Sequence, residues 1–272
     1  MVKRLLRHKP AVITLGIILF ISLIGILAPV IAPNDPYKVD LINKFASPSF
    51  EMPFGGDQLG RCIYSRIIWG IRPTLGLAFI TMIGTIGLGL IMGLIAGYFR
   101  VCDEIIMRIV DIMLAFPSQV MVFAVVALLG IDVRNVILAN VFIKWAWYAR
   151  MIRTNVMKYK EKNFINYSRV IGNSENFILL KHLLPSIASE TAMLASLDIG
   201  WAIINISTLS FLGLGVQAPT PEWGAMLNEA KEVFIANPIQ IIVPGVAIIL
   251  VVSLFNLLGD YLRDALDPKE VM

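Results

Sequence analysis

Few side chains in this sequence could carry catalytic chemistry. The two histidines, His8 and His182, form no HExxH pair for zinc, and no GxSxG turn places a nucleophilic serine. The two cysteines, Cys62 and Cys102, lack the CxxC or Cys/His spacing of a zinc site and are expected to be free thiols. A phosphate-binding G-x-x-x-x-G-K-S/T loop does not occur either. The sequence therefore predicts no catalytic residue, no metal site and no bound cofactor, so another chain must supply any energy from ATP.

The remaining candidates are charged side chains inside apolar segments. Arg108 and Asp111 lie one helical turn apart, which favours a local ion pair near a membrane surface. Asp198 lies deeper and is expected to face a polar pathway or a partner helix. A secondary transporter would need more charge at the membrane midplane and repeated halves. Neither is evident, although that class stays open as an alternative.

Composition indicates that these residues lie in a membrane protein. Of 272 residues, 57% are hydrophobic and only 15% are charged, whereas a soluble domain carries about 25% charge. The net charge of +4 comes from basic residues in short segments between apolar runs, which disfavours a nucleic-acid partner. Lipid is therefore the expected solvent for most of the surface.

Apolar segments long enough to cross a bilayer recur along the chain, since a span takes about 20 helical residues. The first follows the N-terminus and is expected to be retained, because no small-residue cleavage pattern ends a short apolar core. The fold class predicted is an all-α integral membrane protein with six transmembrane helices, in one domain over residues 1–272. The predicted spans are 11–32, 74–98, 105–130, 135–149, 187–212 and 239–258.

The distribution of Lys and Arg predicts the orientation. These residues concentrate in the segments that are cytoplasmic when both termini are inside, and residues 151–185 hold the largest share. We therefore expect an N-in, C-in topology with an external segment at 33–72 and a cytoplasmic loop at 151–185. Within the second span, Gly89, Gly93 and Gly97 form two overlapping GxxxG steps, which predict close helix packing.

The cytoplasmic loop has the pattern of two short amphipathic helices. Phe164, Tyr167 and Ile171 fall on one face of the first helix, and Gly172 ends it. Apolar spacing resumes in the second helix, and Pro185 suits the first turn of the fifth span. An apolar helix pair outside the membrane has little of its own chain to pack against. The pattern predicts a partner protein at this loop.

The same loop resembles that of ABC-importer permeases, written EAA, three residues, Gly, nine residues, then I-x-LP. Gly172 and the Leu-Pro pair stand at this spacing, whereas other residues replace the EAA triplet and the isoleucine. The resemblance implies that the loop lies in a groove on an ATPase subunit, which moves the spans. The implied ATPase-coupling residues are Asn166, Tyr167, Ser168, Gly172, His182, Leu184 and Pro185.

Other blocks resemble permeases of the peptide and nickel group. FGGDQLGRCIYSRIIWGIRPTLG looks like GTDxxGRDxxSRxxxGxRxSL, with Gly56 and Cys62 in place of Thr and Asp. WAWYARMIR and LDIG look more like nickel permeases than dipeptide permeases. The resemblance implies a passage for nickel or a nickel complex in a bacterial inner membrane, with dipeptide or oligopeptide import as the alternative. The blocks lie at residues 54–76, 107–118, 145–153, 197–200, 210–230 and 255–268.

The resemblance also implies partners. They are a second, different permease subunit, two ABC ATPase subunits and an external substrate-binding protein that selects the cargo. Five residues are placed to form an external gate or to contact that binding protein: Arg61, Arg66, Arg72, Glu222 and Trp223.

Overall fold

A computed structural model describes residues 8–266. Within this range the chain is helical and forms no strand, and one isolated antiparallel bridge pairs Gly56 with Cys62. The helices are α2 (Lys9–Ile26), α3 (Ala28–Ile31), η1 (Leu41–Asn43), α4 (Ile63–Tyr98), α5 (Arg100–Leu114), α6 (Ser118–Leu129), α7 (Val133–Lys160), α8 (Asn163–Val170), α9 (Glu175–Phe177), the π-helix η2 (Ile178–Leu183), α10 (Leu184–Phe211), α11 (Trp223–Ala230) and α12 (Ile239–Leu266).

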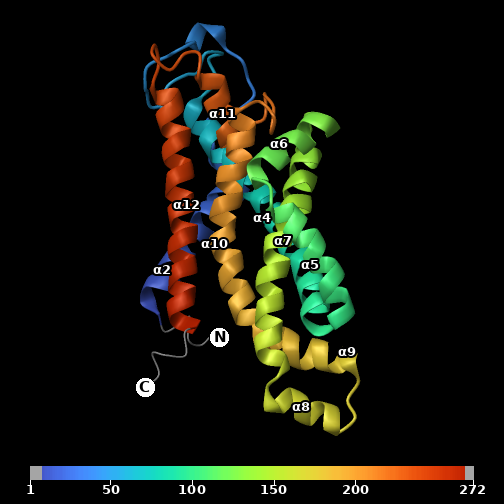
Figure 1. Ribbon diagram of the computed structural model, residues 1–272. Helices are drawn as coiled ribbons and strands as arrows, with labels where there is room; N and C mark the ends of the chain where they lie inside the picture. The colour runs from blue at the N-terminus through green and yellow to red at the C-terminus, as the bar shows by residue number, and fades with distance from the viewer. Residues whose placement is uncertain (1–7, 267–272) are drawn as a thin grey trace.

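The long helices stand side by side, with α8 and α9 at one end and α11 at the other (Figure 1). The segment that joins α3 to α4 also lies at the α11 end (Figure 1). The rings of His8, before α2, and Tyr261, near the end of α12, have centroids 5.4 Å apart. Both ends of the described chain therefore lie at the α8 end of the bundle.

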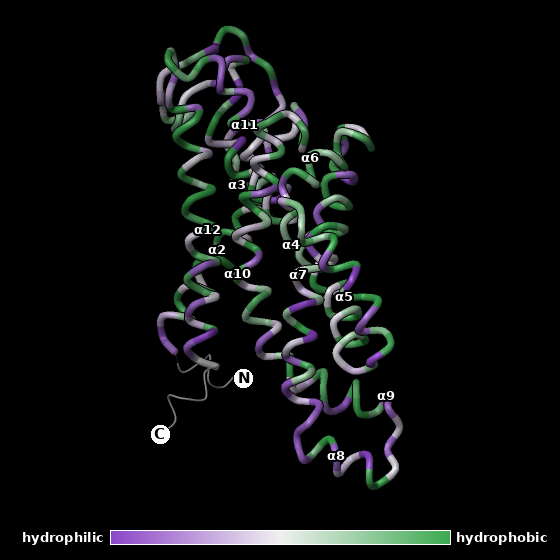
Figure 2. Tube along the Cα trace, viewed as in Figure 1, coloured by the Kyte–Doolittle hydropathy of each residue, from purple (hydrophilic) through white to green (hydrophobic). Residues whose placement is uncertain are grey.

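Four described helices are long and apolar enough to cross a membrane: α2, α4, α12 and the continuous helix Glu175–Phe211. Hydrophobic residues cover much of their length, and hydrophilic residues are frequent around α8 (Figure 2). The bent pair α5–α6 would make a fifth span. The predicted fourth span lies in α7, which is 28 residues long but carries Arg134, Lys144 and Arg150. Length and composition thus support four or five spans, where the sequence predicted six.

The predicted third span, residues 105–130, is not one straight helix. α5 and α6 meet at 88° across a short break. Pro117 lies in that break; it has no N–H to donate and disfavours a helical conformation of the residue before it. The apolar length of residues 105–130 predicted one span and did not predict a bend of this size.

α4 and α7 extend furthest beyond the predicted spans, and α12 also continues to Leu266 rather than ending at residue 258. α4 begins at Ile63 rather than at residue 74, and α7 continues to Lys160 rather than ending at residue 149. The last part of the predicted external segment 33–72 therefore belongs to α4, and the first part of the predicted loop 151–185 belongs to α7. Arginines near the ends of both helices are what made these stretches look too polar for a span.

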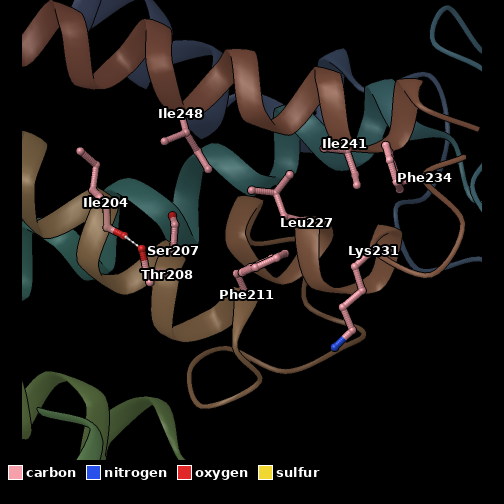
Figure 3. A pocket seen from close by; sticks show the side chains of 9 residues that line it. All are labelled: Ile204, Ser207, Thr208, Phe211, Leu227, Lys231, Phe234, Ile241 and Ile248. Atoms are coloured by element: carbon pink, nitrogen blue, oxygen red, sulfur yellow. Dashed lines mark hydrogen bonds between the residues drawn. The ribbon is translucent and has the colours of Figure 1, made fainter. Parts of the chain in front are cut away.

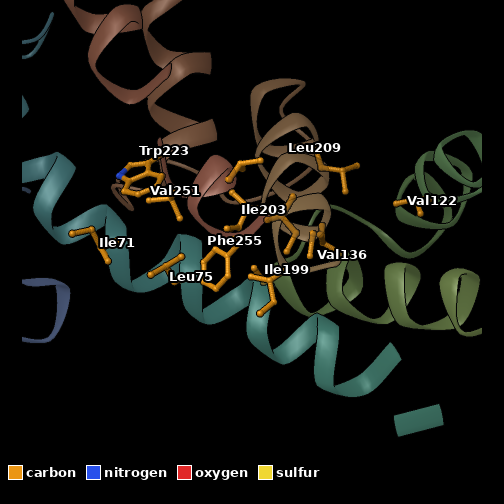
Figure 4. Packing of buried hydrophobic residues seen from close by; sticks show 14 of the residues in the cluster. Ile71, Leu75, Val122, Val136, Ile199, Ile203, Leu209, Trp223, Val251 and Phe255 are labelled. Atoms are coloured by element: carbon orange, nitrogen blue, oxygen red, sulfur yellow. The ribbon is translucent and has the colours of Figure 1, made fainter. Parts of the chain in front are cut away.

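The main apolar core lies where α10 crosses α4 and α12 (Figure 4). Ile203 of α10 is fully buried there, and Leu75 of α4 and Phe255 of α12 belong to the same cluster. Lipid tails are as apolar as leucine, so moving these side chains from lipid into the core gives no hydrophobic gain. The contacts stabilise the bundle by close van der Waals packing instead. The helix that contains α10 has the largest buried share of the candidate spans.

Small residues bring α4 and α7 into close contact. A side chain at Gly93 would lie 2.8 Å from the carbonyl oxygen of Ala149, and one at Gly97 would lie 2.6 Å from Cβ of Val156. Gly89 faces Tyr148 in the same way. The three predicted packing glycines thus all lie against α7, where only a hydrogen atom fits.

Ion pairs tie α5 to α7. Asp111 pairs with Arg150 of α7, where the sequence predicted Arg108 of its own helix. Asp103 accepts two hydrogen bonds from Arg153, the one from Nη2 measuring 2.6 Å, and this carboxylate raises the pKa of Arg153. These two carboxylates of α5 are therefore compensated across the helix pair rather than along one helix.

Candidate functional site

The segment from α8 to the start of α10 is ordered by local turns and caps. Gly172 follows α8 with φ of +83°, a left-handed conformation that glycine adopts at little cost. The Asn173 side chain donates to Ser168 Oγ at 2.9 Å, and Ser174 Oγ caps α9 by accepting from the amide of Phe177 at 3.3 Å. Pro185 lies in the first turn of α10. The chain therefore turns back on itself between two helices.

One side of this helix pair packs on its own chain. Ile165 of α8 and Ile178 and Leu183 of η2 are fully buried, in a cluster with Tyr98 of α4 and Tyr148 of α7. The sequence predicted that the loop has little to pack against, and this prediction was wrong. The buried residues of α8, Ile165 and Ser168, lie three residues apart on one face, whereas the sequence pattern singled out only the exposed face of Phe164 and Tyr167.

The opposite side is apolar and exposed. Val170 is 84% exposed and Tyr167 is 68% exposed, values more typical of a surface charge than of such side chains. We call this surface the coupling patch; its members are Phe164, Tyr167, Val170, Ile171, Phe177 and Leu180. An exposed apolar patch of this kind is typical of an interaction surface.

His182 joins the two halves of the coupling patch. Its ring centroid lies 6.1 Å from that of Phe164 and 5.5 Å from that of Phe177, both in edge-on geometry. Asn166 is exposed beside the coupling patch and Ser168 is buried beneath it. The implied coupling residues at 184 and 185 lie farther along, at the start of α10. The structure thus gathers most of the implied set on one surface and leaves the Leu-Pro pair to begin the next helix.

Tyr98 anchors this segment to α4, and the sequence analysis did not single it out. Its hydroxyl donates to Glu175, and Arg169 lies against it with Nη2 at 3.4 Å from the hydroxyl oxygen. Lys160 donates to the carbonyl oxygen of Tyr98 at 2.6 Å, which satisfies the C-terminal end of α4. Tyr98 could have been found from the sequence as a tyrosine at the end of an apolar span with a basic residue close by.

At the α11 end, a buried polar network ties α4 to α11. Arg61 pairs with Asp57 at 2.6 Å and with Glu229 at 3.0 Å, and Arg66 pairs with Glu229 at 2.6 Å. Both arginine side chains are almost completely buried, at 2% and 1% exposed. Two positive and two negative groups compensate each other, as buried charges require.

The other predicted outer residues are also internal. Glu222 is fully buried and accepts from Thr74 Oγ1 at 3.4 Å, Ser207 Oγ at 3.1 Å and the amide of Ala225 at 2.9 Å. Trp223 is buried and donates from Nε1 to the carbonyl oxygen of Ile67 at 3.1 Å.

Arg72 is exposed, but it donates to the carbonyl oxygens at the end of α2, that of Gly25 at 2.6 Å. Four of the five residues expected to meet a binding protein therefore lie inside the fold, where they fix α11 and the start of α4. Exposed side chains at this end include Ile42, 95% exposed, and Phe50, fully exposed.

Comparison with known families decides what such a helical chain is. A model described as binding-protein-dependent transport system inner membrane component matches residues 85–271, which is most of the chain. The chain belongs to this permease family. A second model, the N-terminal TM domain of oligopeptide transport permease C, matches residues 1–48.

Curated relatives agree over almost the whole length of this permease. The metal-staphylopine import system permease protein CntC of Staphylococcus aureus is 43% identical over 98% of this chain and 93% of its own. The dipeptide transport system permease protein DppC of Alkalihalophilus pseudofirmus is 40% identical over 98% and 88%. The nickel transport system permease protein NikC of Escherichia coli is 38% identical over 95% and 94%.

Membership fixes the general role of the chain. It is a membrane-spanning permease component of an ABC importer, and the family as a whole implies ATPase and substrate-binding partners. The relatives are named for metal-staphylopine, dipeptide, nickel and glutathione transport, so the family does not decide the cargo. Among the described residues, no group of three His, Cys, Asp or Glu side chains could hold a metal ion.

Proposed function

We propose that this permease crosses a bacterial inner membrane six times, with both termini in the cytoplasm, and that α7 provides the least apolar span. The basic residues support this orientation, because four of the six in α7 lie at or after Arg150, in the part that leads into α8 at the end where α2 begins and α12 ends (Figure 1). The α11 end then faces outward, toward the substrate-binding protein.

The observation that carries the proposal is the coupling patch. Six exposed apolar or aromatic side chains stand beyond the apolar helices, on a rigid support whose other face is buried. A groove on an ATPase subunit would cover them, and burial of each large apolar side chain contributes about 1.5–3 kcal/mol. Of the implied coupling residues, Tyr167 belongs to this patch and His182 contacts two of its members, whereas Leu184 and Pro185 begin α10. Closure of the ATPases on ATP would then move α8 and α9.

The assembly proposed is a heterodimer of this chain with a different permease, two ATPase subunits and an external binding protein. A secondary transporter remains the alternative of another class, but the coupling patch would have no purpose there. For the buried outer residues we propose a gate rather than a contact, because Arg61, Arg66 and Glu222 hold α11 against α4 and α10.

For the cargo we propose nickel or a related transition metal, carried as a complex with a small organic ligand. The 43% identity to a metal-staphylopine permease and 38% identity to a nickel permease support this choice. Dipeptide import is the second candidate, favoured by 40% identity to a dipeptide permease. A permease that passes cargo chosen by a binding protein needs no metal-ligand cluster of its own.

Two measurements test the proposal. Purification of the chain from its native membrane should recover a second permease and ATPase subunits, and recovery without any ATPase would refute the importer assignment. Deletion of the chain in a strain with no other nickel importer should lower nickel uptake from trace medium. Normal nickel uptake with lost growth on dipeptides as sole amino-acid source would refute the metal cargo and leave the importer standing.

A further inference from the structure

One narrow stripe of α10 is open on an otherwise enclosed helix. From Ile199 to Phe211 every residue is buried except Trp201, Ile204, Thr208 and Phe211. Their spacing of three, four and three residues places them on one face of the helix. A residue that is open at each turn of an enclosed helix marks a surface that the chain itself does not cover.

Two cavities lie along this stripe. The outer cavity has a volume of about 610 Å³ and is enclosed by α10, α11 and α12, with Ile204 and Thr208 on its wall (Figure 3). The inner cavity has a volume of about 380 Å³ and lies between α5, α6, α7 and α10, with Trp201 and Asp198 on its wall. The stripe passes from one cavity to the other, so the two cavities follow one path along α10.

An ion pair lies in the inner cavity. Lys144 of α7 pairs with Asp198 of α10, and their side chains are 15% and 10% exposed. The Lys144 ammonium lies 3.0 Å from the centroid of the Trp201 ring, so it also makes a cation–π contact. Charged side chains within a membrane face the bundle interior or a water-filled cavity. The stripe therefore borders a charged cavity at Trp201, whereas Ile204, Thr208 and Phe211 line the mostly apolar outer cavity.

We propose that Lys144 and Asp198 bind the cargo on its way through the membrane. The ligand class is a small amino-acid-like molecule that carries a carboxylate and a positive amine, free or as its metal complex. Its carboxylate would replace Asp198 as the partner of Lys144, and its positive group would pair with Asp198. Each charge stays compensated throughout this exchange, which avoids the cost of an unpaired ion in the membrane. This inference rests on the proposed function as an importer.

A bare metal ion fits this site poorly. Lys144 would repel it, and Asp198 would be its one carboxylate ligand among the described residues that line the inner cavity. Divalent transition metals are held by several nitrogen, oxygen or sulfur ligands. A chelate with an organic carboxylate would instead present to Lys144 the group that it binds best. The site therefore distinguishes a metal complex or a peptide from the free ion.

The same two helices provide a control for a merely structural role. Lys158 of α7 pairs with Glu190 of α10 at 3.1 Å, and this hydrogen bond raises the pKa of Lys158. Neither residue lines the inner cavity. If the Lys144–Asp198 pair only tied α7 to α10, removing it would act on every transported molecule alike, as removal of the control pair would.

The experiment uses the complete importer, with both permeases, the ATPases and the binding protein, in proteoliposomes. The probes are labelled dialanine, Ni²⁺ with excess histidine, and free Ni²⁺, and the first two are repeated with the carboxylate replaced by an amide. Each variant is scored by the ratio of carboxylate to amide uptake, which cancels the selectivity that the binding protein contributes equally to all variants. The matched control is Lys158→Gln with Glu190→Gln.

We expect Lys144→Gln to lower this ratio at least about tenfold, because a hydrogen-bonded charge pair is lost. Lys144→Arg and the control should keep the ratio within about twofold of wild type. Asp198→Asn should instead lower the preference for dialanine over N-acetyl-dialanine, which lacks the ammonium. Asp198→Asn decides the question if Lys144→Gln does not assemble.

Three results would overturn the inference: unchanged ratios in the variants, uptake of free Ni²⁺ alone, or uptake of none of the probes by the wild-type importer. Uptake that needs no ATP would refute the proposed function instead.

Discussion

Substitution of Gly172 by valine tests most directly whether the segment from α8 to the start of α10 couples the permease to an ATPase subunit. The backbone there has φ of +83°, and a Cβ atom built on it meets no other atom within 4 Å. The cost is therefore backbone strain alone, with no steric clash to confuse it. A non-glycine residue in the left-handed conformation costs roughly 1–2 kcal/mol, and a β-branched residue lies at the upper end. This corresponds to a shift of about five- to thirtyfold toward a rearranged turn.

A rearranged turn would displace α8 relative to α9 while the spans stay inserted. We expect Gly172→Val to weaken attachment of the ATPase or transport-linked ATP hydrolysis in the purified complex, and Gly172→Asn to retain more of both, because asparagine tolerates this conformation. Gly213→Val is the matched control, since Gly213 also follows a helix with φ of +79° and its nearest atom would lie 3.8 Å away, but it ends α10 at the other end of the bundle. Full attachment and transport in Gly172→Val, or equal loss in Gly213→Val, would refute this reasoning.

Three other predictions concern topology, packing and the outer network. With the native cysteines replaced by serine, an impermeant thiol reagent should label Ile42→Cys in intact cells and Glu161→Cys only after lysis, since both sites are exposed and neither is in the coupling patch; the reverse pattern would invert the topology. Gly93→Leu should reduce the yield of folded protein, because its side chain would collide with α7, whereas Gly87→Leu has open space and should not. Equal yields would contradict the predicted packing. Glu229→Gln should lower the thermal stability of the complex, by about 3 kcal/mol, because two buried arginines lose a partner. An unchanged melting temperature would mean that these arginines find other partners.

Local patterns predicted the features that depend on neighbouring residues. The glycine after α8 and the proline at the start of α10 are read from sequence because they act within one turn. The long apolar segments predicted α2, α10 and α12 because a bilayer sets the length of a span. Both free cysteines were also predicted correctly.

Features that depend on distant residues could not be predicted in this way. Arg66 looked like part of an exposed segment, but it lies in α4 and pairs with a carboxylate 163 residues away. Glu222 looked like a surface residue, yet its hydrogen bonds come from Thr74 and Ser207 on two other helices. A hydropathy window counts such residues as polar, since it does not see the partner that compensates them. The same limit hid the Arg150 partner of Asp111.

The segment from α8 to the start of α10 also connects the two helices that carry Lys144 and Asp198, the pair proposed to bind the cargo. Lys144 lies on α7, which leads into α8, and Asp198 lies on α10, which follows η2. The helix from Glu175 to Phe211 is continuous over 37 residues, so it spans about 55 Å. It therefore joins the coupling patch at one end to the open stripe at the other. An ATPase that moved α8 against α9 would move α7 against α10, and so would change the separation of Lys144 and Asp198. The π-helix η2 lies at the coupling-patch end of this helix, and π-helical turns are frequent at functional sites. If an ATPase moves the coupling patch as proposed, this helix would carry the movement to the pair that is proposed to bind the cargo.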